Sequence, residues 1–298
     1  MEILILAQKD LKAGLGHYNR SRLLYEYFKK KYPVKYYTFK KNLFNKKTYI
    51  YDKKNKRVED FFSKRVKQKC LIISDEISFP KNLINKIKKN DICSISPKGN
   101  LNKFAKLIYT RTKIIGKKSI STNISSNINN FLPGSKLKKI KKKNYFKHLR
   151  KKKLLIGISM GGYDNNNYTL AILKLLFKLN NNLSLHILLN KRNYSQFKKI
   201  KNYIHKKKIN AKLYDMKKNT WTIFKKCTLV LLSGGITAFE SVFVGIPSIN
   251  IINDPQKKML TSYLEKKKIT KIFKIHNKYK ILNLINNYFI NKKLLFEE

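Results

Sequence analysis

Three segments of the chain combine glycines with residues that can bind an anion or move a proton. Each follows a short apolar run and precedes a stretch with helical spacing of its apolar residues. The segments are Gly14-Leu15-Gly16-His17, Met160-Gly161-Gly162-Tyr163-Asp164 and Ser233-Gly234-Gly235-Ile236-Thr237. Paired glycines let successive backbone N–H groups approach a ligand, and a helix N-terminus adds a positive dipole end. Together the three turns predict a site for a phosphorylated ligand.

The first turn also carries His17, and an imidazole is the side chain best suited to moving protons near neutral pH. We therefore treat His17 as the candidate catalytic base; the alternative is a histidine that merely occupies the start of a helix. Arg20 and Arg22 lie one turn further along. Arg20 is either a phosphate neighbour or a solvated surface charge, and the sequence leaves both open.

Acidic residues are scarce, with 16 Asp and Glu against 68 Lys and Arg, so each one in a suggestive place is of interest. Glu240 lies among apolar neighbours and needs a partner if it is ionised. That partner is either a lysine or backbone N–H, or the diol of a sugar, whose two hydroxyls suit a carboxylate. Asp164 fits a helix N-cap as well as a ligand contact. Asp75-Glu76 is a further acidic pair at the end of an apolar run.

The elements that must position these residues alternate between strand and helix, which indicates parallel sheets with crossover helices. In the first half the pattern predicts strands over 2–7, 34–39, 70–74, 91–95 and 112–115 and helices over 16–30, 80–89 and 100–107. The tyrosine-rich segment 40–65 gives no clear order. In the second half the apolar pattern predicts strands over 153–159, 183–189, 210–214, 228–232 and 247–252. It predicts helices over 166–179, 194–206, 219–226, 235–245, 256–267 and 277–291.

Hydrophobic periodicity lapses between the two halves, where a Ser/Asn-rich stretch, Pro133-Gly134 and runs of lysine follow one another. We therefore expect an N-terminal Rossmann-like domain over 1–135, a lysine-rich linker over 136–152 and a C-terminal Rossmann-like domain over 153–298. Each half opens with a strand, a glycine-containing loop and a helix. Two similar α/β domains that face a cleft between them fit this repetition.

Composition bounds the class of protein. A hydrophobic fraction of 42% over 298 residues can build sizeable cores, and no run of eighteen apolar residues or secretory pattern occurs. Three isolated cysteines and scattered histidines predict reduced thiols and no metal site. We expect a cytoplasmic protein that needs no cofactor, with peripheral attachment at the inner membrane face left open.

The net charge of +52 has two explanations, a polyanionic partner or the coding bias of an AT-rich genome. The basic residues are almost all lysine, with seven arginines, and they are spread over every segment. Proteins that recognise nucleic acid tend to use arginine and surfaces on which basic residues cluster. The pattern favours coding bias, with weak attraction to an anionic membrane surface as a by-product and no specific nucleic acid as partner.

With these residues in place the chain resembles the GT-B superfamily of nucleotide-sugar enzymes. More narrowly, it is similar to bacterial UDP-sugar hydrolases of pseudaminic acid synthesis and their relatives in spore-coat and surface-polysaccharide loci. Gly14 to Arg20 matches that family's GxGHxxR, and Met160 to Asp164 matches its MGGxD. Ser233 to Ser241 with Gly245 to Ser248 matches the stretch that grips the nucleotide in many GT-B glycosyltransferases.

The resemblance implies that a UDP-sugar is held mainly by the C-terminal domain, with Glu240 on the ribose and glycine N–H groups on the diphosphate. It implies that His17 assists the displacement of UDP without a metal. Family hydrolases carry Arg-x-Asp after the first strand, where this chain has Leu6-Ala7-Gln8, and their Asp-x-Tyr segment appears only as Ser74-Asp75-Glu76. Both departures concern the sugar side.

The sequence therefore predicts a UDP-sugar hydrolase that releases UDP and a free amino or deoxy sugar for surface-glycan synthesis of the nonulosonic acid type. The alternative is a UDP-sugar-dependent glycosyltransferase of cell-surface polysaccharide synthesis. A basic nucleic-acid-binding protein is the third interpretation. The sequence lacks the aromatic, helix-turn-helix and zinc-ligand patterns of that class.

Overall fold

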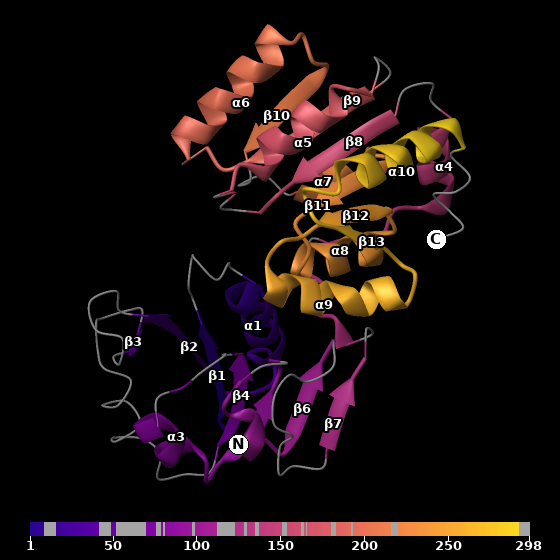
Figure 1. Cartoon of the computed structure of the whole chain (residues 1–298). Helices are drawn as coiled ribbons and strands as arrows, with labels where there is room; N and C mark the ends of the chain where they lie inside the picture. The colour runs from indigo at the N-terminus through magenta and orange to yellow at the C-terminus, as the bar shows by residue number, and fades with distance from the viewer. Residues whose placement is uncertain are drawn as a thin grey trace. The chain divides into compact units, whose positions relative to one another are not determined.

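A computed structural model describes residues 1–8, 16–41, 49–51, 70–75, 79, 81–96, 99–111, 123–127, 130–134, 137–150, 154–161, 164, 166–179, 183–191, 193–215 and 220–291. The chain divides into two compact units, Met1–Ser135 and Lys136–Glu298. Each unit is built on its own sheet, which Figure 1 shows as two separate sets of arrows.

The sheet of the first unit has the order β3-β2-β1-β4-β5-β6-β7. Its strands are β1 (Ile3–Gln8), β2 (Val34–Lys41), β3 (Tyr49–Tyr51), β4 (Leu71–Asp75), β5 (Asp91–Ser94), β6 (Leu107–Thr110) and β7 (Asn123–Ser126). All neighbours pair in parallel except β3, which runs antiparallel to β2. Strand β1 is buried from Ile3 to Ala7, which fits its unbroken apolar sequence, because a central parallel strand is covered on both faces.

The helical segments of the first unit are α1 (Gly16–Phe28), α3 (Lys81–Ile87) and the 3-10 turn η1 (Asn102–Phe104). Helix α1 packs Leu24 and Phe28 on Ile3, Ile5 and Ile73 of the sheet, and Figure 1 shows it lying along β1 and β2. This contact fixes the start of α1 at the end of β1.

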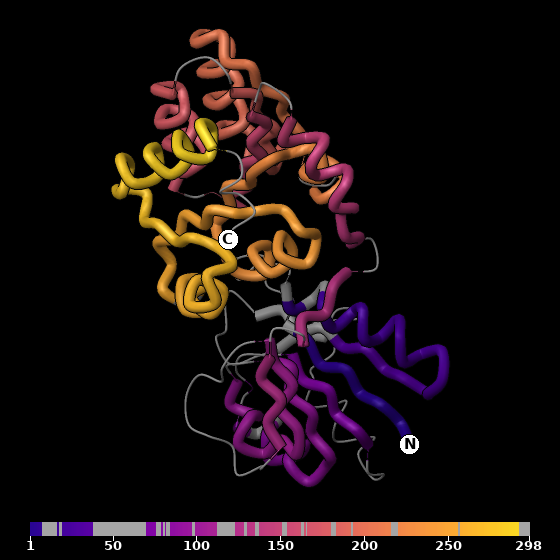
Figure 2. Tube along the Cα trace, turned by 90° about the vertical axis from the view of Figure 1, so that its right-hand side faces the viewer, coloured from indigo at the N-terminus to yellow at the C-terminus, as the bar shows by residue number. Residues whose placement is uncertain are grey.

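The sheet of the second unit has the order β10-β9-β8-β11-β12-β13, and all its pairs are parallel. Its strands are β8 (Leu154–Ser159), β9 (Leu183–Leu189), β10 (Ala211–Asp215), β11 (Leu229–Leu232), β12 (Ser248–Ile251) and β13 (Lys271–Phe273). Its helices are α4 (Lys142–Leu149), α5 (Tyr168–Leu176), α6 (Tyr194–Lys206), α7 (Thr220–Phe224), α8 (Ile236–Val244), α9 (Pro255–Lys266) and α10 (Lys278–Ile290). Helices α8 and α9 lie side by side, as Figure 2 shows in orange.

Most predicted elements are present, and the differences gather at the sheet edges. The helix expected over 100–107 is wrong: a 3-10 turn and strand β6 stand there instead. Strands β3, β7 and β13 were not predicted, and each forms the edge of its sheet. These edge strands have only three or four residues each, so they carry little apolar signal. The strand expected over 112–115 lies outside the described residues.

The lysine-rich segment expected as a linker over 136–152 falls within the second unit. It contains α4, whose Tyr145 and Leu149 are buried in the core of that unit. The Tyr145 hydroxyl donates to the carbonyl of Thr228 at 2.7 Å, and burial raises the pKa of that phenol. The helix is therefore held in the core by the side chains of Tyr145 and Leu149, although most of its sequence is polar.

The three cysteines are free, with Cys70 and Cys227 buried. Burial raises the pKa of the Cys93 thiol to about 11, so its reactive thiolate is scarce at neutral pH. None of the helices described is both long and apolar enough to cross a membrane.

Candidate active site

The candidate base of the first unit lies where the strand order of its sheet reverses. Strand β1 pairs with β2 on one side and β4 on the other, so the crossovers leave it in opposite directions. In parallel sheets of this kind, ligands bind beyond the carboxyl ends of the strands at this switch point. His17 lies in the first turn of α1, which follows β1, and Asp75 ends β4.

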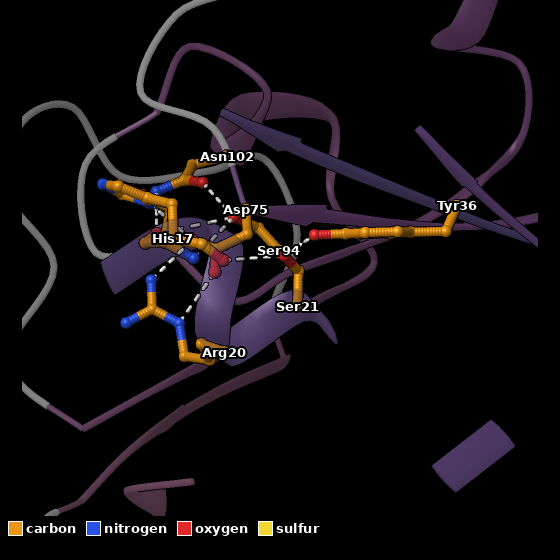
Figure 3. Close-up of polar contacts among 8 residues, drawn as sticks. His17, Arg20, Ser21, Tyr36, Asp75, Ser94 and Asn102 are labelled. Atoms are coloured by element: carbon orange, nitrogen blue, oxygen red, sulfur yellow. Dashed lines mark hydrogen bonds and ion pairs between the residues drawn. The ribbon is translucent and has the colours of Figure 1, made fainter. Parts of the chain in front are cut away.

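His17, Arg20 and Asp75 form one hydrogen-bonded cluster, and Figure 3 shows both basic side chains pointing toward the carboxylate. Nδ1 of His17 lies 2.7 Å from Oδ1 of Asp75. Arg20 donates from Nε to Oδ2 at 2.8 Å and from Nη2 to Oδ1 at 2.5 Å. The exposed fractions are 0% for Asp75, 6% for Arg20 and 18% for His17. The carboxylate is thus buried while the imidazole keeps access to solvent.

The charges decide which atoms carry protons. Burial by itself would raise the pKa of the Asp75 carboxyl, but the charges of Arg20 and His17 and their hydrogen bonds lower it below its ordinary value. An ionised carboxylate only accepts hydrogen bonds, so Nδ1 of His17 donates to it. In the neutral imidazole the lone pair then lies on Nε2, where it can accept a proton from a hydroxyl group.

A second set of polar contacts holds the backbone of this turn. Ser21 donates to the carbonyl oxygen of His17 at 2.6 Å and lies 3.1 Å from the hydroxyl of Tyr36 on β2. Beside Asp75, Ser94 at the end of β5 donates to Oδ1 of Asn102 at 2.6 Å. Figure 3 shows these groups around the carboxylate. The carboxyl edge of this sheet is therefore polar although it is buried.

The second unit brings its two glycine turns together at the matching switch point. Strand β8 pairs with β11, and Ser159 lies opposite Leu232 at their carboxyl ends. A Cβ atom added at Gly161 would lie 3.4 Å from Oγ of Ser233, so the turn after β8 contacts the turn after β11. From α9, the ammonium group of Lys257 reaches Oγ of Ser233 at 3.5 Å.

Glycine is required at two consecutive positions of the turn after β11. Gly234 and Gly235 have φ angles of +73° and +70°. A Cβ at Gly234 would lie 2.3 Å from Cδ1 of Ile252 and 2.8 Å from Oγ1 of Thr261. The N–H of Gly235 donates to that same threonine oxygen at 3.0 Å. The turn is therefore packed tightly against Ile252, which follows β12, and against α9.

This turn leads directly into α8, whose first residues are Ile236 and Thr237, with Gly235 as the N-cap. Backbone N–H groups in the first turn of a helix lack acceptors within the helix and favour an anion. Lys257 adds a positive charge near Ser233, which immediately precedes the two glycines. The arrangement suits a phosphate group.

Glu240 lies in the second turn of α8 and accepts a hydrogen bond from Nε1 of Trp221 at 2.9 Å. The sequence did not suggest this donor. Trp221 is buried and packs edge to face on Phe224, with ring centroids 5.9 Å apart. The indole therefore fixes one carboxylate oxygen of Glu240, and the contact with a ribose stays a prediction.

Asp164 has a structural role in the residues described. Its carboxylate accepts from the N–H groups of Tyr168 and Thr169 at 2.8 Å each, at the start of α5. Gln196 also donates to it at 2.9 Å. The carboxylate thus caps the first turn of a helix, which is one of its two predicted roles; the nucleotide contact stays a prediction.

Two predicted residues, Gly14 and Gly162, lie outside the described part of the chain, and Gly16 begins α1. Sequence reasoning noted Asp75 only as one of an acidic pair and did not place it with His17. The rarity of acids at strand ends was the available signal. Nothing in the sequence distinguishes Lys257 from the many other lysines as a candidate site residue. Within the described ranges, no three His, Cys, Asp or Glu side chains gather as metal ligands would.

No protein-family model matches the chain. A curated relative, the uncharacterized protein MJ1062 of Methanocaldococcus jannaschii, is 26% identical over 218 residues, which is 68% of this chain. The matched region spans 44% of that relative, so the chain corresponds to less than half of its length.

Solved structures share the fold across nearly the whole chain. MurG of Acinetobacter baumannii has a TM-score of 0.64 at 11% identity, over 99% of this chain and 92% of its own. HepE of Anabaena, solved with UDP, has a TM-score of 0.62 at 14% identity, over 99% of this chain and 92% of HepE. The lipopolysaccharide outer core galactosyltransferase WaaB has a TM-score of 0.58 at 14% identity, over 98% and 91%. The chain thus has the α/β fold of GT-B enzymes, with two Rossmann-like units, as the sequence predicted.

Proposed function

We propose that the protein is a glycosyltransferase that uses a UDP-sugar in the synthesis of cell-surface polysaccharide. The observation that carries the proposal is the His17–Asp75 pair at the switch point of the first unit. The solved structures with this fold include one with UDP bound and one galactosyltransferase, which supports transfer more directly than hydrolysis.

In this proposal the second unit holds the nucleotide. The first turn of α8, the hydroxyl of Ser233 and the ammonium group of Lys257 bind the diphosphate. Glu240, oriented by Trp221, binds the ribose hydroxyls. These donors also stabilise the negative charge that develops on UDP as it leaves.

The first unit supplies the base. Nε2 of His17 takes the proton of an acceptor hydroxyl while that oxygen attacks the anomeric carbon of the sugar. The bond from the anomeric carbon to the UDP oxygen breaks, and UDP leaves with the electron pair. Asp75 stabilises the imidazolium that forms, because its carboxylate is already ionised and aligned with Nδ1.

The test is the release of UDP from a panel of UDP-sugars, measured with and without polysaccharide or lipid-linked acceptors. Transfer predicts that UDP release depends on an acceptor and that a glycosylated product forms. His17→Ala should abolish release while UDP still binds in calorimetry. His205→Ala is the matched control, because His205 is an exposed histidine of α6. Full activity of His17→Ala would refute the role of the base.

A second candidate, hydrolysis of a UDP-sugar, is favoured by the motifs around His17 and Asp164. The same Nε2 atom would then take the proton of a water molecule. Release of UDP and a free sugar at an equal rate with and without acceptor would select this reaction. Absence of both UDP binding and turnover would remove both candidates.

A further inference from the structure

We propose that Arg20 is a positioning residue that fixes the charge and the orientation of the Asp75 carboxylate, and through it the proton on Nδ1 of His17. The inference deepens the proposed function, on which its kinetic part rests. Arg20 is 6% exposed and bound to a side chain of this protein, so it is not the solvated surface charge that the sequence allowed.

The geometry makes Arg20 a clamp. Its Nε and Nη2 atoms donate to the two different oxygens of Asp75, so the guanidinium plane and the carboxylate plane are held together. A two-point contact prevents rotation of the carboxylate, which a single hydrogen bond would allow. Oδ1, which takes the shorter arginine bond, is also the oxygen bonded to His17. The direction of the histidine contact therefore depends on the arginine.

The charge balance depends on Arg20 as well. Asp75 has no exposed surface, and a buried carboxylate is stable only when its charge is compensated. With Arg20 present, the charge of the guanidinium compensates that of the carboxylate, so no added proton is needed for compensation. Without Arg20, compensation requires an added proton, on Asp75 or on His17. A proton on Asp75 removes the acceptor of Nδ1, and a proton on His17 removes the lone pair of the base.

Arg22 gives a matched comparison on the same helix. It lies two residues further along α1, and it is exposed where Arg20 is buried. Residues two apart on a helix point to different faces. Substitution of Arg22 therefore changes the same residue type in the same helix without touching the carboxylate.

The experiment compares Arg20→Lys, Arg20→Gln, Arg22→Lys and Arg22→Gln in the full chain, with circular dichroism to confirm folding. Nitrogen-15 NMR of the imidazoles, with His17 assigned from a His17→Gln variant, reports the position of the proton. Steady-state kinetics with the UDP-sugar found active separates kcat from KM. Arg20→Lys serves if Arg20→Gln does not fold, because it keeps the charge and loses only the two-point contact.

We expect wild type and both Arg22 variants to show the same imidazole signals, with a proton held on Nδ1 of His17. Arg20→Gln should show a mixture of proton positions or a charged ring, with kcat reduced about ten-fold or more and KM unchanged. Arg20→Lys should lie between them. Wild-type NMR signals and kcat in both Arg20 variants would overturn the inference. If the wild type turned over no UDP-sugar, the proposed function would fail, while the NMR comparison would still decide the role of Arg20.

Discussion

The two units place different chemistry at the same topological position. At the switch point of the first unit, His17 and Arg20 both bind the buried carboxylate of Asp75. At that of the second unit, two glycine turns meet beside the start of α8, with Ser233 and Lys257 next to them. In both units the sheet topology fixes where the polar groups gather. The side chains at that point determine whether it is suited to proton transfer or to anion binding.

The carboxylates sharpen this contrast. In the first unit Asp75 faces a histidine and an arginine, both able to carry charge. In the second unit Asp164 accepts hydrogen bonds from backbone N–H groups, which are neutral donors, and Glu240 accepts one from the indole of Trp221. A carboxylate of the first kind can help a proton to move, while those of the second kind hold local structure or orient a ligand.

The strongest test of the comparison is Asp75→Asn. An amide at this position can donate to Nδ1 and favours the wrong imidazole tautomer, so kcat should fall by a factor on the order of 10⁴. Affinity for UDP should not change, because the proposed function places the nucleotide on the second unit. Asp91→Asn is the control, since Asp91 is exposed and its ion pair with Lys106 is exposed too. A parallel loss of UDP affinity in calorimetry would contradict the division of roles.

The second test addresses the glycine turn. Gly234→Ala forces a Cβ into Ile252 and Thr261 at a positive φ angle, so it should destabilise the second unit by roughly 1–3 kcal/mol. Affinity for UDP should fall with it, because the start of α8 must shift. Gly134→Ala is the control, since nothing lies within 4 Å of its Cβ position. Thermal unfolding and calorimetry measure both effects, and unchanged values for Gly234→Ala would refute the turn's role.

Acid should weaken the first cluster. The pKa of Asp75 is lowered in the folded protein, so at acidic pH the unfolded chain binds this proton more readily than the folded one. The stabilisation is complete above the ordinary carboxyl pKa of about 4 and is lost as pH falls toward the lowered value. In urea unfolding between pH 3 and 7, the difference between wild type and Asp75→Asn should therefore shrink on acidification. A difference independent of pH would exclude an ionised Asp75.

A smaller effect is expected at Trp221→Phe, which keeps an aromatic ring and removes the indole donor to Glu240. One lost hydrogen bond of about 1 kcal/mol corresponds to roughly five-fold weaker binding of UDP. Inorganic pyrophosphate, which has no ribose, should bind equally well to both proteins. Equal weakening for the two ligands in calorimetry would show that Glu240 does not act on the ribose.

The smallest effect concerns the net charge of +52. Weak attraction to anionic lipid headgroups predicts sedimentation with vesicles of phosphatidylglycerol, none with phosphatidylcholine, and release by added salt. Sedimentation that survives 0.5 M salt would point instead to a specific contact.

The sequence by itself determined the alternation of strands and helices and the three glycine turns, because apolar periodicity and glycine act within a few residues of the chain. It could not place the edge strands β3, β7 and β13, because strands of three or four residues are too short to show such a pattern. It also read the α4 segment as a linker, because two buried side chains among lysines give no period.

Only the tertiary structure decided which residues act together. Asp75 lies 58 residues from His17, and Thr261 lies 26 residues from Gly235. These contacts arise because β1 pairs with β4 and α9 packs beside α8. Pairing between strands that are distant in sequence depends on burial summed over a whole sheet, and no local pattern of residues records that sum.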